Sequence, residues 1–307
     1  MTALLFAIAG YEYLRDDLAR LAESDCGTIE RHRYPDGERH LQFETEIDHR
    51  DVVLIGGTVS DEATLELYDL ASAAIENGAH TLTLIIPWFG YSTMERATHR
   101  GEVVTAKTRA RLLSAIPQAG SGNRVVLFDL HTEGIPYYFE GGLRPFHVYG
   151  KAFVFQACRE LFGDHPHIVL ASTDAGRAKW VESLANDLGV PAAFIIKRRV
   201  DGEDTEVRAV SAKVQGKPVV IYDDMIRTGS SLLHAAEAYR HSGAKSVTAI
   251  ASHGEFSGDA IDRIGRSGLI DKVICTDSHP RARSIRHEIL QVHSVAPLFV
   301  PFVKKAE

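Results

Sequence analysis

The chain has 307 residues, of which 45% are hydrophobic and 24% are charged. These proportions are typical of a globular protein and exclude a disordered chain, a collagen-like repeat and a disulfide scaffold. With 34 basic and 41 acidic residues the net charge is −7, so a general nucleic-acid or membrane-surface binder is not expected, because such proteins need a basic face. The length suits two domains of roughly 150 residues each.

Three cysteines, Cys26, Cys158 and Cys275, lie far apart and form no Cys-x-x-Cys pair. A zinc site or a disulfide framework is therefore not expected, and the predicted location is the cytoplasm. The opening MTALLFAIAG has no basic segment before its apolar run, which indicates a buried strand and not a signal peptide. No apolar stretch approaches the roughly 20 residues needed to span a bilayer, so no membrane partner is expected.

In the first half, apolar runs that end in Gly or polar residues predict strands at 4–10, 51–57, 81–91 and 124–131. Between the second and third runs, the apolar spacing of residues 61–80 predicts a helix that ends at Gly78. The second half repeats this scheme. It has predicted strands at 167–173, 192–199, 217–224, 246–253 and 272–278, and predicted helices at 178–189 and 230–244.

Nearly continuous Val/Ile/Leu strands that alternate with helices predict an α/β fold with parallel sheets covered on both faces. The two halves meet near residues 145–150, and we expect domains at 1–146 and 147–307. In such sheets ligands bind beyond the C-terminal ends of the strands, so these ends are where functional residues are sought.

One strand end, in the segment 219–239, combines two features of a ribose-phosphate site. A buried run delivers the adjacent acids Asp223 and Asp224, which can accept hydrogen bonds from vicinal sugar hydroxyls. The small residues that then lead into a helix are Thr228, Gly229, Ser230 and Ser231. Such a loop can surround a phosphate with N–H groups at the helix N-terminus. Either feature alone would favour an Asp-rich turn with a Ser/Thr cap, but their combination favours ribose-phosphate binding.

This segment resembles the phosphoribosyl-diphosphate (PRPP) binding loop of type I phosphoribosyltransferases, and among proteins with that loop the match is best to PRPP synthases, the ribose-phosphate diphosphokinases. Further segments match in order: HRYPDGERHLQF, LIIPWFGYSTMERATHRGEVVTAKTRARLL, VVLFDLHTEGIPYYFEG, ASTDAGRAKW, IIKRRVDGEDTEV, ASHGEFSGDAIDRI, TDSHP and HSVAPLF. The resemblance thus covers nearly the whole chain. It implies two tandem type I phosphoribosyltransferase-like domains, with nucleotide on the first and ribose phosphate on the second.

The resemblance implies transfer of the diphosphoryl group of ATP to the C1 hydroxyl of ribose 5-phosphate, with Mg²⁺ as cofactor and AMP as the second product. The matching metal positions are His131 and Asp174. Because Mg²⁺ prefers oxygen ligands, hydrogen bonding to the triphosphate is an alternative role for His131. Lys197 and Arg199 match a basic lid that closes on the triphosphate, although three consecutive basic residues also suit a solvated strand end.

On the nucleotide side, Tyr34 matches an aromatic platform for the base, with Asp36 and Glu38 beside it. In isolation this YPDGE segment is simply a turn. Glu95 and Arg96 are the further nucleotide-binding residues implied. Members of the family assemble through domain faces, so a homo-oligomer is expected.

The chain differs from the common bacterial and mammalian class of synthases at three positions. Thr93 and Met94 stand where that class carries arginine and glutamine, and Gly134 stands where it carries another glutamine. These positions make it more similar to the plant-type class II synthases. The resemblance then implies that donors besides ATP, such as other NTPs, are used, and that neither phosphate activation nor ADP inhibition occurs.

A second departure is Arg227, where most synthases carry an acid. It could add a phosphate contact, accommodate a larger acceptor such as ADP-ribose, or form a surface ion pair of little energetic weight. Two other functions compete with the synthase reading: a phosphoribosyltransferase that consumes PRPP, and a synthase-like regulatory subunit without activity. The two-domain length and the presence of the Lys197/Arg199 lid together with YPDGE argue against the first, and the intact acids, His131 and lid residues argue against the second.

Overall fold

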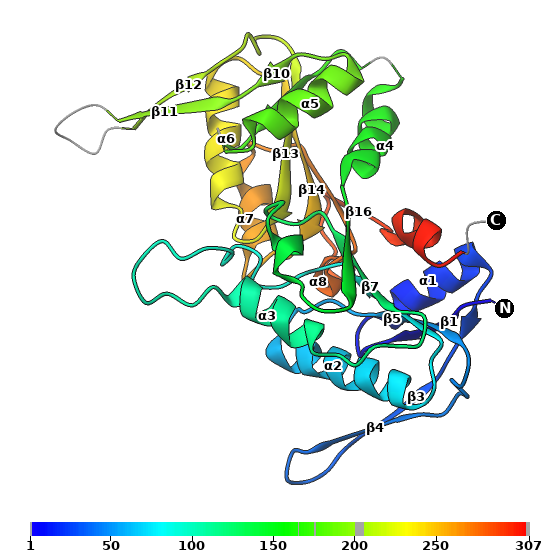
Figure 1. The fold of residues 1–307 in the computed structure, drawn as a ribbon. Helices are drawn as coiled ribbons and strands as arrows, with labels where there is room; N and C mark the ends of the chain where they lie inside the picture. Colours follow the sequence, from blue (N-terminus) through cyan, green and yellow to red (C-terminus); the bar gives the residue numbers. More distant parts are fainter. Residues whose placement is uncertain (1, 165, 175, 200–205, 305–307) are drawn as a thin grey trace. The chain divides into compact units, whose positions relative to one another are not determined.

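The computed structural model describes residues 2–164, 166–174, 176–199 and 206–304, and for 196–199 and 206–209 it describes the backbone alone. The chain forms two units, one comprising Met1–Tyr149 and Ser294–Glu307 and the other Gly150–His293 (Figure 1). Each unit contains its own six-stranded parallel sheet flanked by helices, as the α/β prediction required. The expected domains, 1–146 and 147–307, differ from these two units mainly at the C-terminus, because the chain returns to the first unit from Ser294 onward.

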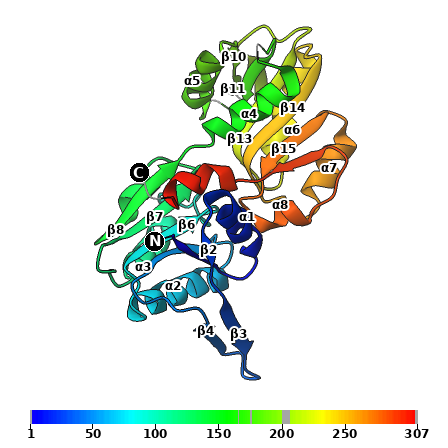
Figure 2. The ribbon, with the colours of Figure 1, turned by 90° about the vertical axis from the view of Figure 1, so that its right-hand side faces the viewer.

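The first unit has the strand order β2-β1-β5-β6-β7-β8. The strands are β1 (Leu4–Ala7), β2 (Asp25–Cys26), β5 (Asp51–Ile55), β6 (Thr81–Ile86), β7 (Asn123–Phe128) and β8 (Leu143–Val148). The helices α2 (Asp61–Glu76) and α3 (Thr105–Ser114) cover one face, and α1 (Glu12–Ala22) covers the other with the 3-10 helix η2 (Ala296–Phe302) (Figure 1 and Figure 2). A short 3-10 helix, η1 (Ile135–Tyr138), follows β7. The chain goes from β1 to β2 on one side of it and then to β5 on the other side. Because crossovers between parallel strands are right-handed, this reversal places α1 and α2 on opposite faces of the sheet.

The C-terminal segment is fixed to the first unit by polar contacts as well as by packing of η2 on α1. The guanidinium of Arg124 donates to the carbonyl of Phe302 at 2.6 Å, and the hydroxyl of Ser294 donates to Asp17 at 3.3 Å. Phe299 is fully buried in the core of this unit. Through these contacts, the segment that follows β16 packs on the first unit and not on the second.

A two-stranded antiparallel hairpin, β3 (Ile29–Arg33) with β4 (Arg39–Phe43), projects from the first unit (Figure 1 and Figure 2). It carries the YPDGE segment at its tip, where Gly37 has a φ of 94° that favours glycine. The turn was predicted, but the two strands were not, because β3 is largely exposed and charged and β4 is only half-buried.

The second unit repeats the same topology with the order β10-β9-β13-β14-β15-β16. Its strands are β9 (Val169–Ser172), β10 (Ala192–Ala193), β13 (Pro218–Ile226), β14 (Ser246–Gly254), β15 (Lys272–Thr276) and β16 (Leu290–His293). Its helices are α4 (Lys151–Phe162), α5 (Ala178–Leu188), α6 (Ser230–His241), α7 (Ala260–Ser267) and α8 (Pro280–Ser284). The crossovers place α6 and α7 on the face opposite α5 (Figure 2).

One predicted strand is divided in the structure. Residues 192–199 were expected to form a single strand, but only β10 joins the main sheet, while β11 (Ile195–Arg199) pairs antiparallel with β12 (Glu206–Val210). The division occurs at Phe194, whose amide donates to the hydroxyl of Ser211 and whose carbonyl accepts from the amide of the same residue. These bonds turn the chain out of the main sheet and into the β11–β12 pair.

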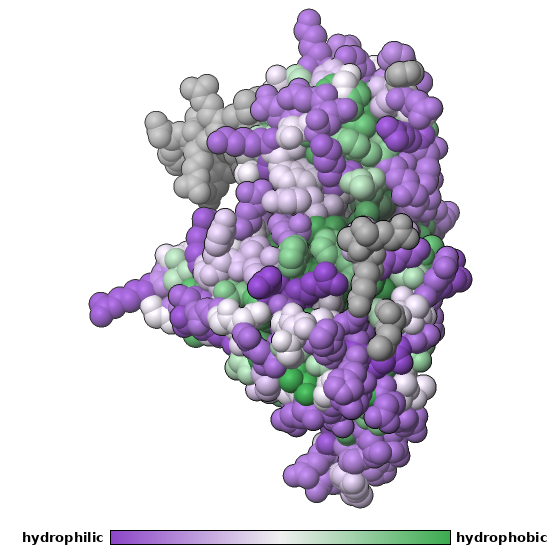
Figure 3. All heavy atoms as spheres, turned by 45° about the vertical axis from the view of Figure 1, so that its right-hand side comes forward, coloured by the Kyte–Doolittle hydropathy of each residue, from purple (hydrophilic) through white to green (hydrophobic). Residues whose placement is uncertain are grey.

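In the described part of the chain, no helix is long and apolar enough to cross a membrane. The face drawn in Figure 3 is mostly hydrophilic, with hydrophobic residues scattered between the polar ones.

Candidate active site

The candidate site of the second unit lies where two neighbouring strands lead to helices on opposite faces of the sheet. β9 and β13 run side by side in parallel, with Tyr222 opposite Ser172. β9 continues to α5 and β13 to α6, so a crevice between their C-terminal ends is expected at this point. Both strand ends carry predicted site residues: Asp174 follows β9, and the acid pair belongs to β13.

The acid pair is buried and held by neighbouring polar groups. Asp224 is only 2% exposed, and its carboxylate lies 2.8 Å from the guanidinium of Arg177. The same guanidinium lies 3.5 Å from Asp223, which also accepts a hydrogen bond of 3.0 Å from the hydroxyl of Thr173. Burial and the neighbouring Asp224 carboxylate raise the pKa of Asp223, and Arg177 opposes that shift. The pair thus forms a polar floor that can accept hydrogen bonds.

After the acids, β13 continues for two residues to Ile226, and the predicted loop then opens helix α6. Gly229 has a φ of 76°, and a Cβ at this position would lie 2.9 Å from the side chain of Ile264 on α7. Among the described residues, no side chain caps the N-terminus of α6, although Thr228 and Ser230 hydroxyls lie 3.4 Å apart beside it. Uncapped N–H groups and the helix dipole make this loop suitable for an anion.

The loop is tied to the segment after β14. Arg227 forms a 3.5 Å ion pair with Glu255, and its carbonyl accepts from the amide of Ser257 at 3.0 Å. The carbonyl of Thr228 accepts a hydrogen bond from Arg263. Of the three roles considered for Arg227, the surface ion pair is the one with a partner in this structure.

Asp174 lies at the exposed mouth of the crevice. Its Oδ1 accepts a 2.8 Å hydrogen bond from the amide of Gly176, so the carboxylate already orders its own turn. Within the described ranges, no cluster of three or more His, Cys, Asp or Glu side chains could hold a metal ion. Carboxylate oxygens are nevertheless the donors that suit Mg²⁺, and Asp174 and Asp223 supply them at adjacent strand ends.

Lys197 and Arg199 occupy the second half of β11, in register with Arg208 and Glu206 of β12. Their side chains lie outside the described part of the structure, as do residues 200–205 of the predicted lid. Their catalytic role stays a prediction.

On the first unit, the tip of the β3–β4 hairpin presents the predicted nucleotide residues. Tyr34 is 46% exposed, and its ring meets His32 edge-on with centroids 4.8 Å apart. The Asp36 carboxylate accepts from the amide of Glu38 at 3.0 Å, which orders the turn. An exposed ring on a rigid turn is suited to stacking against a base.

The other predicted residues of this unit come from two further loops. Glu95 is half-buried, its carbonyl accepts from the hydroxyl of Tyr138 at 2.6 Å, and its carboxylate lies 3.5 Å from exposed Arg96. His131 is half-buried beyond the end of β7. Near it the buried Asp129 has a φ of 39°, an unusual backbone conformation for a residue other than glycine.

The structure therefore places Asp174, the acid pair and the loop from Arg227 to Ser231 at the C-terminal ends of the adjacent strands β9 and β13. Sequence reasoning missed Arg177 and Thr173, which contact the acids from the β9 side. Their positions, three residues after and one residue before Asp174, were a usable signal, because adjacent parallel strands end at the same edge.

Comparisons with known proteins agree with this geometry. A family model described as the N-terminal domain of ribose phosphate pyrophosphokinase matches residues 3–116, and one described as the phosphoribosyl synthetase-associated domain matches residues 169–300. A ribose-phosphate pyrophosphokinase of Synechococcus elongatus is 35% identical over 299 residues, which cover 96% of this chain and 87% of that protein. One from Nostoc is 36% identical over 300 residues, with the same shares covered.

Among solved structures, the phosphoribosylpyrophosphate synthetase from Mycobacterium smegmatis has a TM-score of 0.86 to this chain. The two are 28% identical, and the match covers 99% of this chain and 98% of that one.

Proposed function

Because this chain belongs to the ribose-phosphate pyrophosphokinase family, we propose that it transfers the diphosphoryl group of ATP to the C1 hydroxyl of ribose 5-phosphate, giving PRPP and AMP. The observation that best supports the proposal is the arrangement of residues at the C-terminal ends of β9 and β13. It joins a buried acid pair to an uncapped loop of small residues at the start of α6. A sugar phosphate carries the two groups that these features suit, vicinal hydroxyls and an anion.

In this proposal Asp223 and Asp224 accept hydrogen bonds from the ribose hydroxyls. The loop residues Thr228, Gly229, Ser230 and Ser231 hold the 5-phosphate with N–H and hydroxyl groups. In the transfer, the C1 oxygen forms a bond to the β-phosphorus of ATP. The bond from that phosphorus to the α,β-bridging oxygen breaks, AMP leaves, and the hydroxyl proton is released to water.

Mg²⁺ is the cofactor that the proposal requires, and when bound it neutralises charge on the phosphate oxygens. Asp174 suits it through its carboxylate: the amide of Gly176 donates to Oδ1, and Oδ2 is the second oxygen of the group. His131 suits Mg²⁺ less well because its ring offers nitrogen, so we favour a hydrogen bond from His131 to the triphosphate. Lys197 and Arg199 supply the positive charge that stabilises the transferring phosphoryl group.

On the donor side, Tyr34 stacks on the base, with Asp36, Glu38, Glu95 and Arg96 as further contacts. We further propose the behaviour of class II synthases: use of other NTPs besides ATP, and activity without added phosphate. The support for this finer assignment is the pair Thr93 and Met94, which replaces the arginine and glutamine of the common class. A cytoplasmic homo-oligomer also stays a prediction.

The experiment that tests the function is release of AMP from ATP and ribose 5-phosphate, with Mg²⁺ and without added phosphate. The purified chain should form AMP and PRPP in equal amounts. Replacing Lys197 with alanine should lower kcat by about 10²–10³-fold, because one charge-stabilising group is lost from the transition state. Absence of AMP with ribose 5-phosphate and with every other sugar phosphate tried would refute the synthase function in favour of a non-catalytic subunit.

A panel of acceptors in the same assay tests the larger-acceptor alternative. The Arg227–Glu255 ion pair accounts for the arginine without a second phosphate, so we expect ribose 5-phosphate to be preferred over ADP-ribose.

A further inference from the structure

The two sheets share one strand order, yet their crevices at the strand ends differ. In the first unit the equivalent point lies between β1 and β5, followed by Gly56 and Gly57. A Cβ on Gly56 would lie 2.6 Å from Ile8, and one on Gly57 would lie 2.1 Å from the hydroxyl of Tyr11. Ile8 and Tyr11 are fully buried. Side chains of the protein itself therefore occupy this point, where the second unit has its acid pair.

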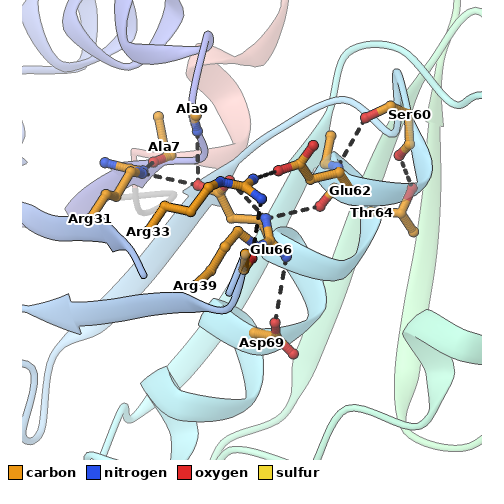
Figure 4. Close-up of polar contacts among 12 residues, drawn as sticks. Ala7, Ala9, Arg31, Arg33, Arg39, Ser60, Glu62, Thr64, Glu66 and Asp69 are labelled. Atoms are coloured by element: carbon orange, nitrogen blue, oxygen red, sulfur yellow. Dashed lines mark hydrogen bonds and ion pairs between the residues drawn. The ribbon is translucent and has the colours of Figure 1, made fainter. Parts of the chain in front are cut away.

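A glutamate of helix α2 completes the filling of this point (Figure 4). Glu66 is 6% exposed, and its Oε1 accepts from the amide of Ala9, just after β1, at 3.0 Å. The same oxygen accepts from Nε of Arg31 at 3.0 Å, and Nη2 of Arg31 donates to the carbonyl of Ala7 at 2.6 Å. Arg31 belongs to β3, so the strand end of the sheet binds the hairpin.

The second strand of the hairpin is bound to the same helix (Figure 4). Nη1 of Arg39 lies 3.5 Å from Oε2 of Glu66 and donates to the carbonyl of Glu62 at 3.2 Å. The carboxylate of Glu62 pairs in turn with Arg33. Glu66 is the one carboxylate in this group that contacts both strands of the hairpin, and it is the buried one.

The strand register separates these contacts from the predicted nucleotide residues. Arg33 lies opposite Arg39, so with Arg31 two residues earlier the three arginines share one face of the hairpin. His32 lies opposite His40, and the amide of Tyr34 bonds to the carbonyl of Glu38, so Tyr34 and Glu38 belong to the other face. One face thus binds α2, and the opposite face presents the ring proposed to stack on the base.

We propose that Glu66 is a positioning residue for the donor nucleotide. It fixes the β3–β4 hairpin through Arg31 and Arg39, and thereby sets where Tyr34 and Glu38 meet the nucleotide. The inference rests on the proposed function, because it assigns the hairpin to donor binding. A freely moving hairpin would have to be ordered each time the nucleotide binds, which weakens binding without altering the reacting groups.

The test compares Glu66→Gln with wild type in the AMP-release assay. The substitution keeps size and an acceptor oxygen for Ala9 but removes the charge that binds two arginines. KM for ATP should rise by about tenfold or more, while kcat and KM for ribose 5-phosphate stay within about threefold, the pattern expected when ground-state and transition-state binding are lost together. Glu76→Gln, an exposed position at the end of the same helix, is the matched control and should match wild type.

A second variant tests the same inference if Glu66→Gln does not fold. Arg39→Gln removes one of the two strand contacts and should raise KM for ATP in the same direction by a smaller factor. Hydrogen exchange of the hairpin amides should be faster in both variants. An unchanged KM for ATP in a folded variant, or equal losses for both substrates, would overturn the inference. Wild-type chain that releases no AMP would instead refute the proposed function, so the two failures are distinguishable.

Discussion

Arg177 is the only guanidinium that the described structure places against both acids of β13, and its removal gives a sharp test of how that pair is held. Arg177→Met keeps much of the side-chain length and removes the charge. At an effective dielectric constant of about 20, unit charges separated by the 2.8 Å between Arg177 and Asp224 attract by about 6 kcal/mol. Desolvation offsets part of this, and removal of one partner from a buried pair costs about 3–5 kcal/mol. Because the Arg177 side chain is 17% exposed, we expect the lower end, about 3 kcal/mol.

The loss of folding stability should depend on pH, and the direction of this dependence follows from the pKa of Asp223. Burial and Asp224 already raise the pKa of Asp223, and losing Arg177 raises it further, so the folded variant retains a proton that the unfolded chain releases. Stability of the variant therefore falls as pH rises above the ordinary aspartate pKa of about 4. In wild type the pKa of Asp223 is already about 8, so both proteins lose stability in parallel up to that pH, and we expect a constant difference of about 3 kcal/mol between them there. The difference should grow only above pH 8, where wild-type Asp223 releases its proton and the variant still holds it.

Unfolding of the second unit can be followed by itself, since Trp180 on α5 stacks on Tyr222 with centroids 5.0 Å apart. The other tryptophan, Trp88, belongs to the first unit, and replacing it with phenylalanine leaves one reporter. Urea unfolding of Arg177→Met and of wild type would be measured in this background from pH 6 to pH 9.5, on both sides of the Asp223 pKa of about 8. Arg159→Met, at an exposed position on α4, is the matched control and should cost less than about 0.5 kcal/mol. A loss below about 1 kcal/mol at pH 7, or a difference that grows mainly below pH 8, would refute this account of the acid pair.

Three further predictions follow from the second unit. Gly229→Ala should destabilise the protein by about 1–2 kcal/mol and raise KM for ribose 5-phosphate, because a residue with a Cβ is forced to a φ of 76°. An unchanged KM would show that this loop does not bind the sugar phosphate. Arg227→Gln and Glu255→Gln should each change that KM by less than about fivefold, since the pair is partly exposed, whereas a hundredfold loss confined to Arg227→Gln would make the arginine a phosphate ligand. Burial lowers the pKa of His279 from 6.5 to about 4, so the unfolded chain binds a proton that the folded chain does not. Stability should therefore fall by up to about 3 kcal/mol as pH drops from 6.5 to 4, and His279→Gln should flatten that part of the urea-unfolding pH profile.

The core strands could be predicted because burial on both faces leaves a nearly continuous apolar run in the sequence. Residues 219–222 and 247–251 are buried in the structure, and these runs were found. The hairpin strands β3 and β4 were missed because only a few of their residues, Ile29, Leu41 and Phe43, pack on the core, while polar contacts to α2 hold Arg31 and Arg39. The return of the chain after Ser294 was missed for a related reason: a short 3-10 helix gives no periodic signal, and its place is set by contacts with α1.

The same distinction applies to the site. Asp223, Asp224 and the loop after them are contiguous, so their combined chemistry could be seen in the sequence. The role of Arg177 depends on β9 lying beside β13, and that of Glu255 on the segment after β14 lying beside the loop. These contacts join residues far apart in the sequence, and they can be predicted only when the order of the strands in the sheet is known.

The two units therefore have the same topology but different side chains at the same point of the sheet. At the ends of β9 and β13, acids and small residues leave polar groups that suit a ligand. At the ends of β1 and β5, Tyr11 and Glu66 occupy that point and bind the hairpin. The proposed nucleotide contacts of the first unit accordingly lie away from the ends of β1 and β5, at the hairpin tip that carries Tyr34 and in the loops after β6 and β7. If Glu66→Gln leaves donor binding intact, this division between a binding crevice and a filled one has no functional consequence, and the matching strand orders reflect fold alone.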